Sequence, residues 1–204
     1  MYYEIEKRNH GLAHDPLKAC IVPRAIGWIS TISKDGRSNL APYSQFTTLT
    51  FYPPVVALGC NQNGKGERKD TVINIEQTGE FVYNLVTYDL RDAMNITAKP
   101  VELGVDEFEL AGLHKAESVM VKPFRVEESP IQFECKYIQT LRIPGNGRVG
   151  TADVIIGKVV AVHIKDEFIG PDERVDVLKM KPLGRLGYDY YCTVSDCINI
   201  ERPK

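Results

Sequence analysis

The stretch WISTISKDGRSNLAPYSQFTTLT, residues 28–50, decides how the fold begins. Its centre is the polar turn Lys34-Asp35-Gly36-Arg37, in which Gly36 suits the positive φ of a tight hairpin. The arms on either side mix apolar residues with short hydroxyl side chains, and Pro42 interrupts the second arm. This pattern predicts a β-hairpin, with a bend or an unpaired edge at Pro42 because proline cannot donate to a strand ladder.

The rest of the chain has the pattern of short strands with a few helices inserted. Apolar, β-branched runs that predict strands occupy 55–60, 80–87, 131–141 and 154–164, the last apolar enough for a central strand. Helical spacing predicts helices at 69–79 and 90–98; Asp70 or Thr71 would cap the first, and Gly79 would end it. The Pro- and Gly-containing segment 99–114 predicts a surface excursion. Because strands and helices do not alternate regularly, we expect a mainly β fold, a closed or partly closed barrel.

The composition is that of a globular protein: 204 residues, 43% hydrophobic, 25% charged, with a formal net charge of −2. The length predicts a single domain spanning 1–204. We expect no nucleic-acid partner, because Lys and Arg form no dense block, and no membrane partner, because no apolar run approaches roughly 18 residues. The charged N-terminus lacks the apolar core of a signal peptide, and the five cysteines are scattered without metal-binding spacing, which predicts a reduced, cytoplasmic protein.

Several motifs fail to support hydrolytic, metal or dinucleotide-fold chemistry. GNGRVG, residues 145–150, matches a nucleotide-binding pattern, but strand-like residues follow it where a helix is needed, so we predict a hairpin loop. The four histidines are dispersed, and His163 lies on an apolar strand, where a structural histidine is the simplest interpretation. Ser44 has no nucleophile-elbow context. A haem-binding sensor would need a well-placed axial ligand, which these histidines do not obviously supply.

The segment RKDT, residues 68–71, is a more informative motif. It places Arg68 and Lys69 at the start of the predicted helix, after a Gly-rich loop. Free backbone N–H groups at a helix start attract phosphate, and the two cations add positive charge. Together with the hydroxyl-rich arms of 28–50, this start suits a phosphorylated aromatic cofactor.

Five segments, in this order, resemble the flavin reductase-like proteins of the FMN-binding split-barrel superfamily. They are PRAIGWISTISKDGRSNLAPYSQFTTLTFYPPVVALGCN, KDTVINIEQTGEFVYNLV, GVDEFELAGL, ESPIQFECKY and IIGKVVAVHI. The resemblance covers roughly residues 15–190 and is to the branch that includes flavoredoxin and the reductase component of nitrilotriacetate monooxygenase. Ala25 departs from the Pro-Arg-Pro that is usual in the family.

The resemblance implies a six-stranded antiparallel split barrel with helical additions. It also implies a homodimer that binds FMN noncovalently near the subunit interface. The positions that match the family's FMN-contacting segments are Arg24, Trp28, Ser30, Thr31, Ser44, Gln45, Phe46, Thr47, Asn61, Lys69, Asp70 and Thr71. The first strand and the Ser44–Thr47 segment would line the ring and ribityl chain, and Asn61 and Lys69–Thr71 would lie at the phosphate end.

The activity that the resemblance implies is hydride transfer from NADH or NADPH to flavin N5, with reduced flavin or electrons passed to a monooxygenase or another acceptor. The cofactor carries this chemistry, which fits a sequence with no evident acid–base apparatus, and the catalytic residues stay unassigned. The alternative is an FMN-binding electron carrier without NAD(P)H turnover of its own. The sequence alone does not separate the two.

Overall fold

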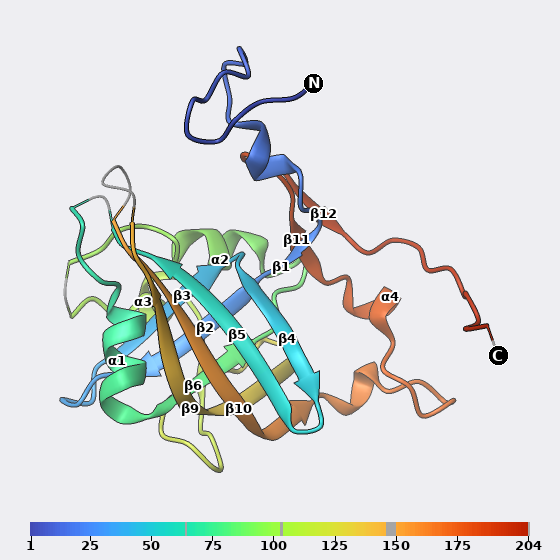
Figure 1. Ribbon diagram of the computed structural model, residues 1–204. Coiled ribbons are helices and arrows are strands. Elements are labelled where there is room, and N and C mark those ends of the chain that lie inside the picture. Colours follow the sequence, from blue (N-terminus) through green and yellow to red (C-terminus); the bar gives the residue numbers. More distant parts are fainter. Residues whose placement is uncertain (64, 103, 146–149, 204) are drawn as a thin grey trace.

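A seven-stranded antiparallel sheet, curled into a barrel, forms the centre of the computed structural model, which describes residues 1–63, 65–102, 104–145 and 150–203 (Figure 1). The strand order is β3-β2-β6-β9-β10-β5-β4. The bounds are β2 Gly27–Ile32, β3 Ser38–Tyr43, β4 Phe46–Phe51, β5 Pro54–Asn61, β6 Glu80–Asn84, β9 Ile131–Ile143 and β10 Ala152–Ile164. The mainly β prediction is confirmed, with seven strands in this sheet where six were expected.

The opening stretch forms the predicted hairpin and one strand more. β2 pairs with β3 around the 34–37 turn, where Gly36 has a φ of 81°. The chain then leaves the hairpin at Ser44, and β4 pairs with β5 at the opposite edge of the sheet. Pro42 therefore lies in the edge strand β3, as predicted, where its missing N–H leaves no ladder bond unmade. The interpretation of 28–50 as only two arms is wrong, because the 44–45 bend separates two strands.

The longest strands, β9 and β10, are consecutive antiparallel neighbours. β10 lies between β9 and β5, so the prediction of a central strand at 154–164 is confirmed. The GNGRVG segment joins these two strands, and its residues 146–149 lie outside the described residues. β10 begins at Ala152, just after this segment, where a dinucleotide fingerprint requires a helix.

Both predicted helices are present, and one prediction about them is wrong. α1, Asp70–Thr78, ends at Gly79, whose φ of 76° is the expected left-handed conformation. Its N-cap residue is Lys69 and no side chain caps the first turn, so neither Asp70 nor Thr71 is the cap. α2, Arg91–Ile96, lies within the predicted 90–98.

The 99–114 segment is more than a surface excursion. It contains the short helix α3, Glu107–Leu110, whose Phe108 side chain is buried in an apolar cluster. The Glu107 carboxylate is also buried and accepts a hydrogen bond from the N–H of Leu40 on β3. The acidic residues in the sequence suggested an exposed segment. Instead, the buried Phe108 side chain and the hydrogen-bonded Glu107 carboxylate anchor it to the barrel.

Two apolar clusters lie on opposite faces of β2. Alternation along this strand sends Ile29 into the barrel interior with Phe81, and Trp28 to the outer face with Phe108 and Met94. α1 contributes Val72 and Ile75 to the interior cluster, and α2 and α3 cover the outer one. The barrel therefore has a filled interior, and a ligand must bind at its surface.

A segment from the first part of the chain and two from the last part pair beside the barrel. β1, Arg24–Ala25, pairs with β11, Leu183–Arg185, which pairs with β12, Tyr191–Thr193. The blue and red segments of Figure 1 lie side by side there. The remaining elements are η1 Pro16–Ala19, β7 Lys115–Ala116, β8 Arg125–Val126, η2 Asp166–Phe168 and α4 Val177–Met180. None of the helices in the described part of the chain has the length and apolar character of a membrane span.

Candidate functional site

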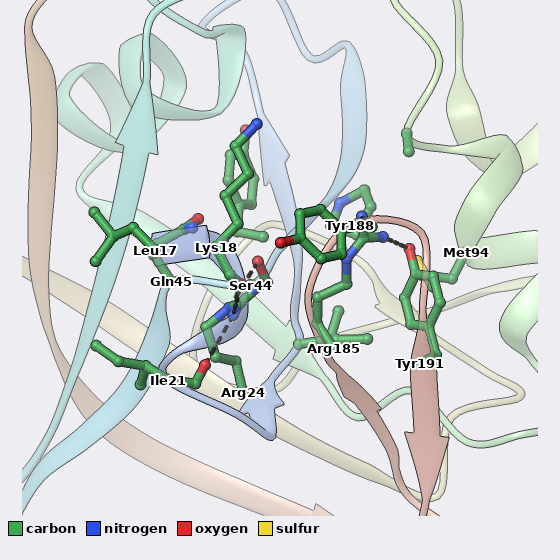
Figure 2. A pocket seen from close by; sticks show the side chains of 14 residues that line it. Leu17, Lys18, Ile21, Arg24, Ser44, Gln45, Met94, Arg185, Tyr188 and Tyr191 are labelled. Atoms are coloured by element: carbon green, nitrogen blue, oxygen red, sulfur yellow. Dashed lines mark hydrogen bonds between the residues drawn. The ribbon is translucent and has the colours of Figure 1, made fainter. Parts of the chain in front are cut away.

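A pocket of about 510 Å³ opens where the end of β3 meets the small terminal sheet (Figure 2). The segment between β3 and β4 forms one wall, and η1, β11 and β12 form the others. Its lining comprises Leu17, Lys18, Ile21, Arg24, Ile26, Pro42, Tyr43, Ser44, Gln45, Met94, Ala98, Arg185, Tyr188 and Tyr191. Three of the predicted site residues, Arg24, Ser44 and Gln45, are among them.

The Arg24 guanidinium organises this pocket. Its Nη1 donates to the carbonyl oxygens of Lys18 at 3.1 Å and Ile21 at 2.8 Å, and its Nη2 donates to that of Leu186 at 2.9 Å. Its Nε lies 3.5 Å from the Ser44 hydroxyl oxygen. One side chain thus holds the N-terminal segment, the β3–β4 junction and the segment after β11 in a fixed arrangement (Figure 2).

Tyr43 connects the pocket to the start of α1. Burial and the nearby Cys60 raise the pKa of Tyr43 well above its ordinary value, and the adjacent Thr71 hydroxyl acts in the opposite direction. Burial also raises the pKa of the Cys60 thiol to about 12, while Lys69 lowers it. The Gln45 carbonyl accepts from the Gly59 N–H at 2.7 Å. The β3–β4 junction therefore adjoins both the end of β5 and the helix start.

The start of α1 offers a place for an anion. Among the described residues, the N–H groups of Asp70 and Thr71 have no hydrogen-bond acceptor, and no side chain caps the turn. Lys69 is half-buried beside them, and Asn61 is exposed at the end of β5. Free N–H groups, the positive end of the helix and an ammonium group together attract negative charge. Three predicted residues, Lys69, Asp70 and Thr71, are consecutive at this helix start.

Arg68 was predicted to add to this positive charge, but its guanidinium is paired with carboxylates. Its Nη1 and Nη2 donate to the Glu76 carboxylate at 2.8 and 2.6 Å, and its Nε donates to Asp153 at 3.0 Å. The hydrogen bonds to Glu76 raise the pKa of Arg68, and the same bonds lower the pKa of Glu76. Arg142 donates to the second oxygen of the buried Asp153 at 3.0 Å. These bonds join α1 to β9 and β10, so Arg68 is a structural cation.

Trp28 and Ser30 lie on the outer face of β2 and are not among the residues that line the pocket. The Trp28 ring is fully buried, and its Nε1 donates to the Thr97 hydroxyl at 2.9 Å. Ser30 is also fully buried and donates to the Phe124 carbonyl at 2.5 Å. These side chains hold the segments that cover β2. Both side chains bond within the protein, and their role in FMN binding stays a prediction.

Three further predicted residues occupy different surroundings. The Thr31 hydroxyl is buried and accepts from the Asn74 amide of α1 at 3.0 Å. Phe46 is buried against Tyr83, with ring centroids 4.6 Å apart. Thr47 is exposed on the edge strand β4. The structure therefore brings Arg24, Ser44 and Gln45 together in the pocket and places Lys69, Asp70 and Thr71 at the start of α1. Asn61 lies at the end of β5, and the other five lie in the core or on the edge. Whether any of the twelve contacts FMN stays a prediction.

Sequence reasoning missed eleven of the fourteen residues that line the pocket. Among them are Lys18 from η1 and, from the C-terminal region, Arg185, Tyr188 and Tyr191. The available signal was the Gly- and Tyr-rich segment PLGRLGYDYYCTV, residues 182–194, whose composition is unusual for a tail outside the core.

Comparison with known proteins gives the class. Residues 19–178 match the family described as the flavin reductase like domain. An uncharacterized protein of Aquifex aeolicus is 39% identical over 191 residues, which cover 94% of each chain. The chain therefore belongs to the flavin reductase-like family.

Solved structures agree with this fold. Nitrilotriacetate monooxygenase component B from Bacillus cereus has a TM-score of 0.89 at 27% identity, covering 98% of both chains. Flavoredoxin of Desulfovibrio vulgaris (Miyazaki F) has a TM-score of 0.76 at 17% identity, covering 98% of this chain and 97% of that one. The split-barrel prediction is confirmed.

Proposed function

We propose that this chain is an FMN-binding flavin reductase that takes hydride from NAD(P)H and supplies reduced flavin or electrons to an acceptor. The observation that carries the proposal is the pocket beside Arg24, Ser44 and Gln45. Its described lining holds three cations and no carboxylate, in a chain of the flavin reductase-like family. The similarity to nitrilotriacetate monooxygenase component B supports a monooxygenase as the class of acceptor.

The pocket lining fits FMN in size and chemistry. Its volume of about 510 Å³ is within the range of small-molecule sites. Ile26, Pro42 and Tyr43 offer an apolar and aromatic wall, and Ser44 and Gln45 offer hydrogen-bonding groups at its edge. In the proposal these residues hold the flavin ring.

The phosphate end of FMN would belong to the start of α1. The free N–H groups of Asp70 and Thr71 and the Lys69 ammonium suit a phosphate, and the exposed Asn61 amide suits the ribityl hydroxyls. Tyr43 lies between this start and the pocket. FMN, when bound, would supply the ring that accepts hydride and from which electrons pass to the acceptor.

The chain itself would bind and orient the cofactor. The phenol of Tyr43 is protonated at neutral pH, as in an ordinary tyrosine, and burial raises its pKa further, so it can donate a hydrogen bond. Arg24 is held by three carbonyl oxygens, so its position is fixed before a ligand binds. Such preorganisation reduces the conformational entropy lost on binding.

The proposal is tested by the visible spectrum of the purified protein. We expect oxidised-flavin absorbance, either at once or after FMN is added, and rapid anaerobic bleaching with NADH or NADPH. A protein that gains no visible band with FMN would refute flavin binding. FMN bound without bleaching by either nicotinamide would favour the electron carrier over the reductase.

We also propose a homodimer in a reducing, cytoplasmic setting. Apolar side chains on and after the edge strand β4 are exposed, among them Leu49 at 53%, Phe51 at 75% and Tyr52 at 96%. A second copy of the chain is a natural partner for such a surface. All five cysteines are free thiols, which agrees with a reducing compartment. Light scattering that gives the mass of one chain would contradict the dimer.

Replacing Lys69 with glutamate is expected to weaken FMN binding by about 1–3 kcal/mol, because it places a negative charge beside the proposed phosphate site. Flavin titration followed by fluorescence measures the dissociation constant. Lys34→Glu makes the same charge change in the exposed 34–37 turn and should leave the constant within about twofold. An unchanged constant in Lys69→Glu would remove Lys69 from the site.

A further inference from the structure

The cations of the pocket differ in how they are used. Arg24 is occupied by three backbone carbonyls. Lys18 is exposed, its ammonium has no hydrogen-bond or ion-pair partner among the described residues, and in Figure 2 its side chain points away from Arg24. Arg185 lies opposite, on β11. Lys18 is therefore the cation that is most free to meet a ligand.

Arg185 is held in place but not neutralised. Its Nη1 donates to the Tyr191 hydroxyl and its Nη2 to the Tyr188 carbonyl, and its guanidinium carbon lies 4.5 Å from the centre of the Tyr191 ring. The nearest carboxylate oxygen, on the fully exposed Asp189, is 3.8 Å away. An ion pair of this kind is strongly screened by water. The guanidinium therefore keeps positive charge available on the pocket side.

The charge balance favours a multiply charged anion. No described lining residue is acidic, and Lys18, Arg24 and Arg185 are all positive. A phosphate monoester carries about −1.5 to −2 charges at neutral pH and accepts several charge-assisted hydrogen bonds, which Arg and Lys provide. The proposed phosphate site of FMN lies at the start of α1, which leaves these two terminal-segment cations without an assigned ligand.

We infer that Lys18 and Arg185 recognise the 2′-phosphate of NADPH, so that the chain prefers NADPH to NADH. The inference rests on the proposed function for the identity of the substrate. It deepens that proposal, because NADPH and NADH differ only in this phosphate. The pocket shares Met94, Arg185 and Tyr191 with a neighbouring cavity of about 530 Å³, which gives a long dinucleotide room beyond the ring site.

The test is the ratio of kcat/KM for NADPH to kcat/KM for NADH, with FMN at saturation. This ratio does not depend on how much of a preparation is active. We expect a ratio above about ten in the unaltered protein and a fall of about tenfold in both Lys18→Gln and Arg185→Gln, the scale of one lost charge-assisted hydrogen bond. Lys34→Gln, in the exposed turn, is the matched control and should keep the ratio.

Two results would overturn the inference. One is a preference of the unaltered protein for NADH. The other is a ratio of kcat/KM values that neither variant lowers. If the FMN dissociation constant then rises in both variants, these cations belong to the phosphate of the cofactor. Lys18→Gln is the more secure variant, because Lys18 is exposed and its carbonyl, which Arg24 holds, is unchanged.

Calorimetry separates failure of this inference from failure of the proposed function. Adenosine 2′,5′-bisphosphate should bind about tenfold more tightly than adenosine 5′-monophosphate, and Lys18→Gln should remove the difference. Equal binding of the two nucleotides contradicts the inference even if flavin is bound and reduced. If the protein binds no flavin but still distinguishes the two nucleotides, only the proposed flavin reductase function is refuted.

Discussion

Glu134→Ala is expected to lower the free energy of unfolding by about 3–5 kcal/mol, the cost of leaving buried charged and polar partners unpaired. The Glu134 side chain is fully buried on β9. Its carboxylate accepts from the N–H groups of Val119 at 2.8 Å, Met120 at 2.5 Å and Val121 at 3.1 Å. His163 Nε2 lies 2.6 Å from the same carboxylate. One side chain therefore fixes a loop that no regular secondary structure holds.

The same carboxylate should make stability depend on pH. Burial pushes the pKa of Glu134 upwards, but the N–H groups of Val119 and Met120 and the His163 ring outweigh it, and the pKa is lowered. A lowered pKa in the folded state means that the stabilisation is complete above the unfolded-state value of about 4.3. It is lost as the pH falls through the folded-state value.

Urea unfolding at pH 7 and between pH 4 and 3 measures both effects. Glu76 and Glu80 also have lowered pKa values, so the informative quantity is the difference between the unaltered protein and the variant. That difference should shrink towards acid pH. Glu127→Ala, at a carboxylate for which the described residues show no hydrogen bond or ion pair, is the control and should change stability by less than about 0.5 kcal/mol. An acid-independent difference would contradict the role assigned to Glu134.

Strong periodic patterns in the sequence predicted most of the fold. The apolar run 154–164 became the central strand β10, and Gly79 ends α1 in the left-handed conformation, because local backbone preferences and burial agree at both places. The division of 28–50 into β3 and β4 was not predictable in the same way. Ser44 and Gln45 fit a continuing strand equally well, and only pairing with β5, at the other edge of the sheet, separates the two.

The site was less predictable because its parts are distant in the chain. Ser44 and Gln45 came from family resemblance, but the Arg24–Leu186 hydrogen bond joins residues 162 positions apart, which no local pattern reveals. The hydroxyls of Ser30 and Thr31 show the reverse problem. Composition alone does not distinguish a hydroxyl that faces a ligand from one that bonds to a neighbouring segment, and here both bond within the protein.

Arg24→Gln is expected to weaken FMN binding roughly 100-fold, about 3 kcal/mol, which corresponds to two hydrogen bonds of a charged group. Arg24 is the residue on which both walls of the pocket depend: its loss frees the carbonyls of Lys18, Ile21 and Leu186 and removes the neighbour of the Ser44 hydroxyl. The N-terminal segment should then separate from the segment after β11. Flavin titration and limited proteolysis near residues 16–22 measure the two consequences.

Arg24→Lys distinguishes charge from geometry. Lysine keeps the positive charge but not the planar guanidinium, which reaches three carbonyl oxygens at once. Arg24→Lys should therefore bind FMN less than about tenfold more tightly than Arg24→Gln. Arg37→Gln is the matched control and should bind FMN normally, because Arg37 is exposed and, among the described residues, forms an ion pair with Asp35 alone. If Arg24→Lys binds FMN as tightly as the unaltered protein, the guanidinium acts as a simple charge. If Arg24→Gln binds FMN normally, this pocket is not the flavin site, and the start of α1 must hold the cofactor by other contacts.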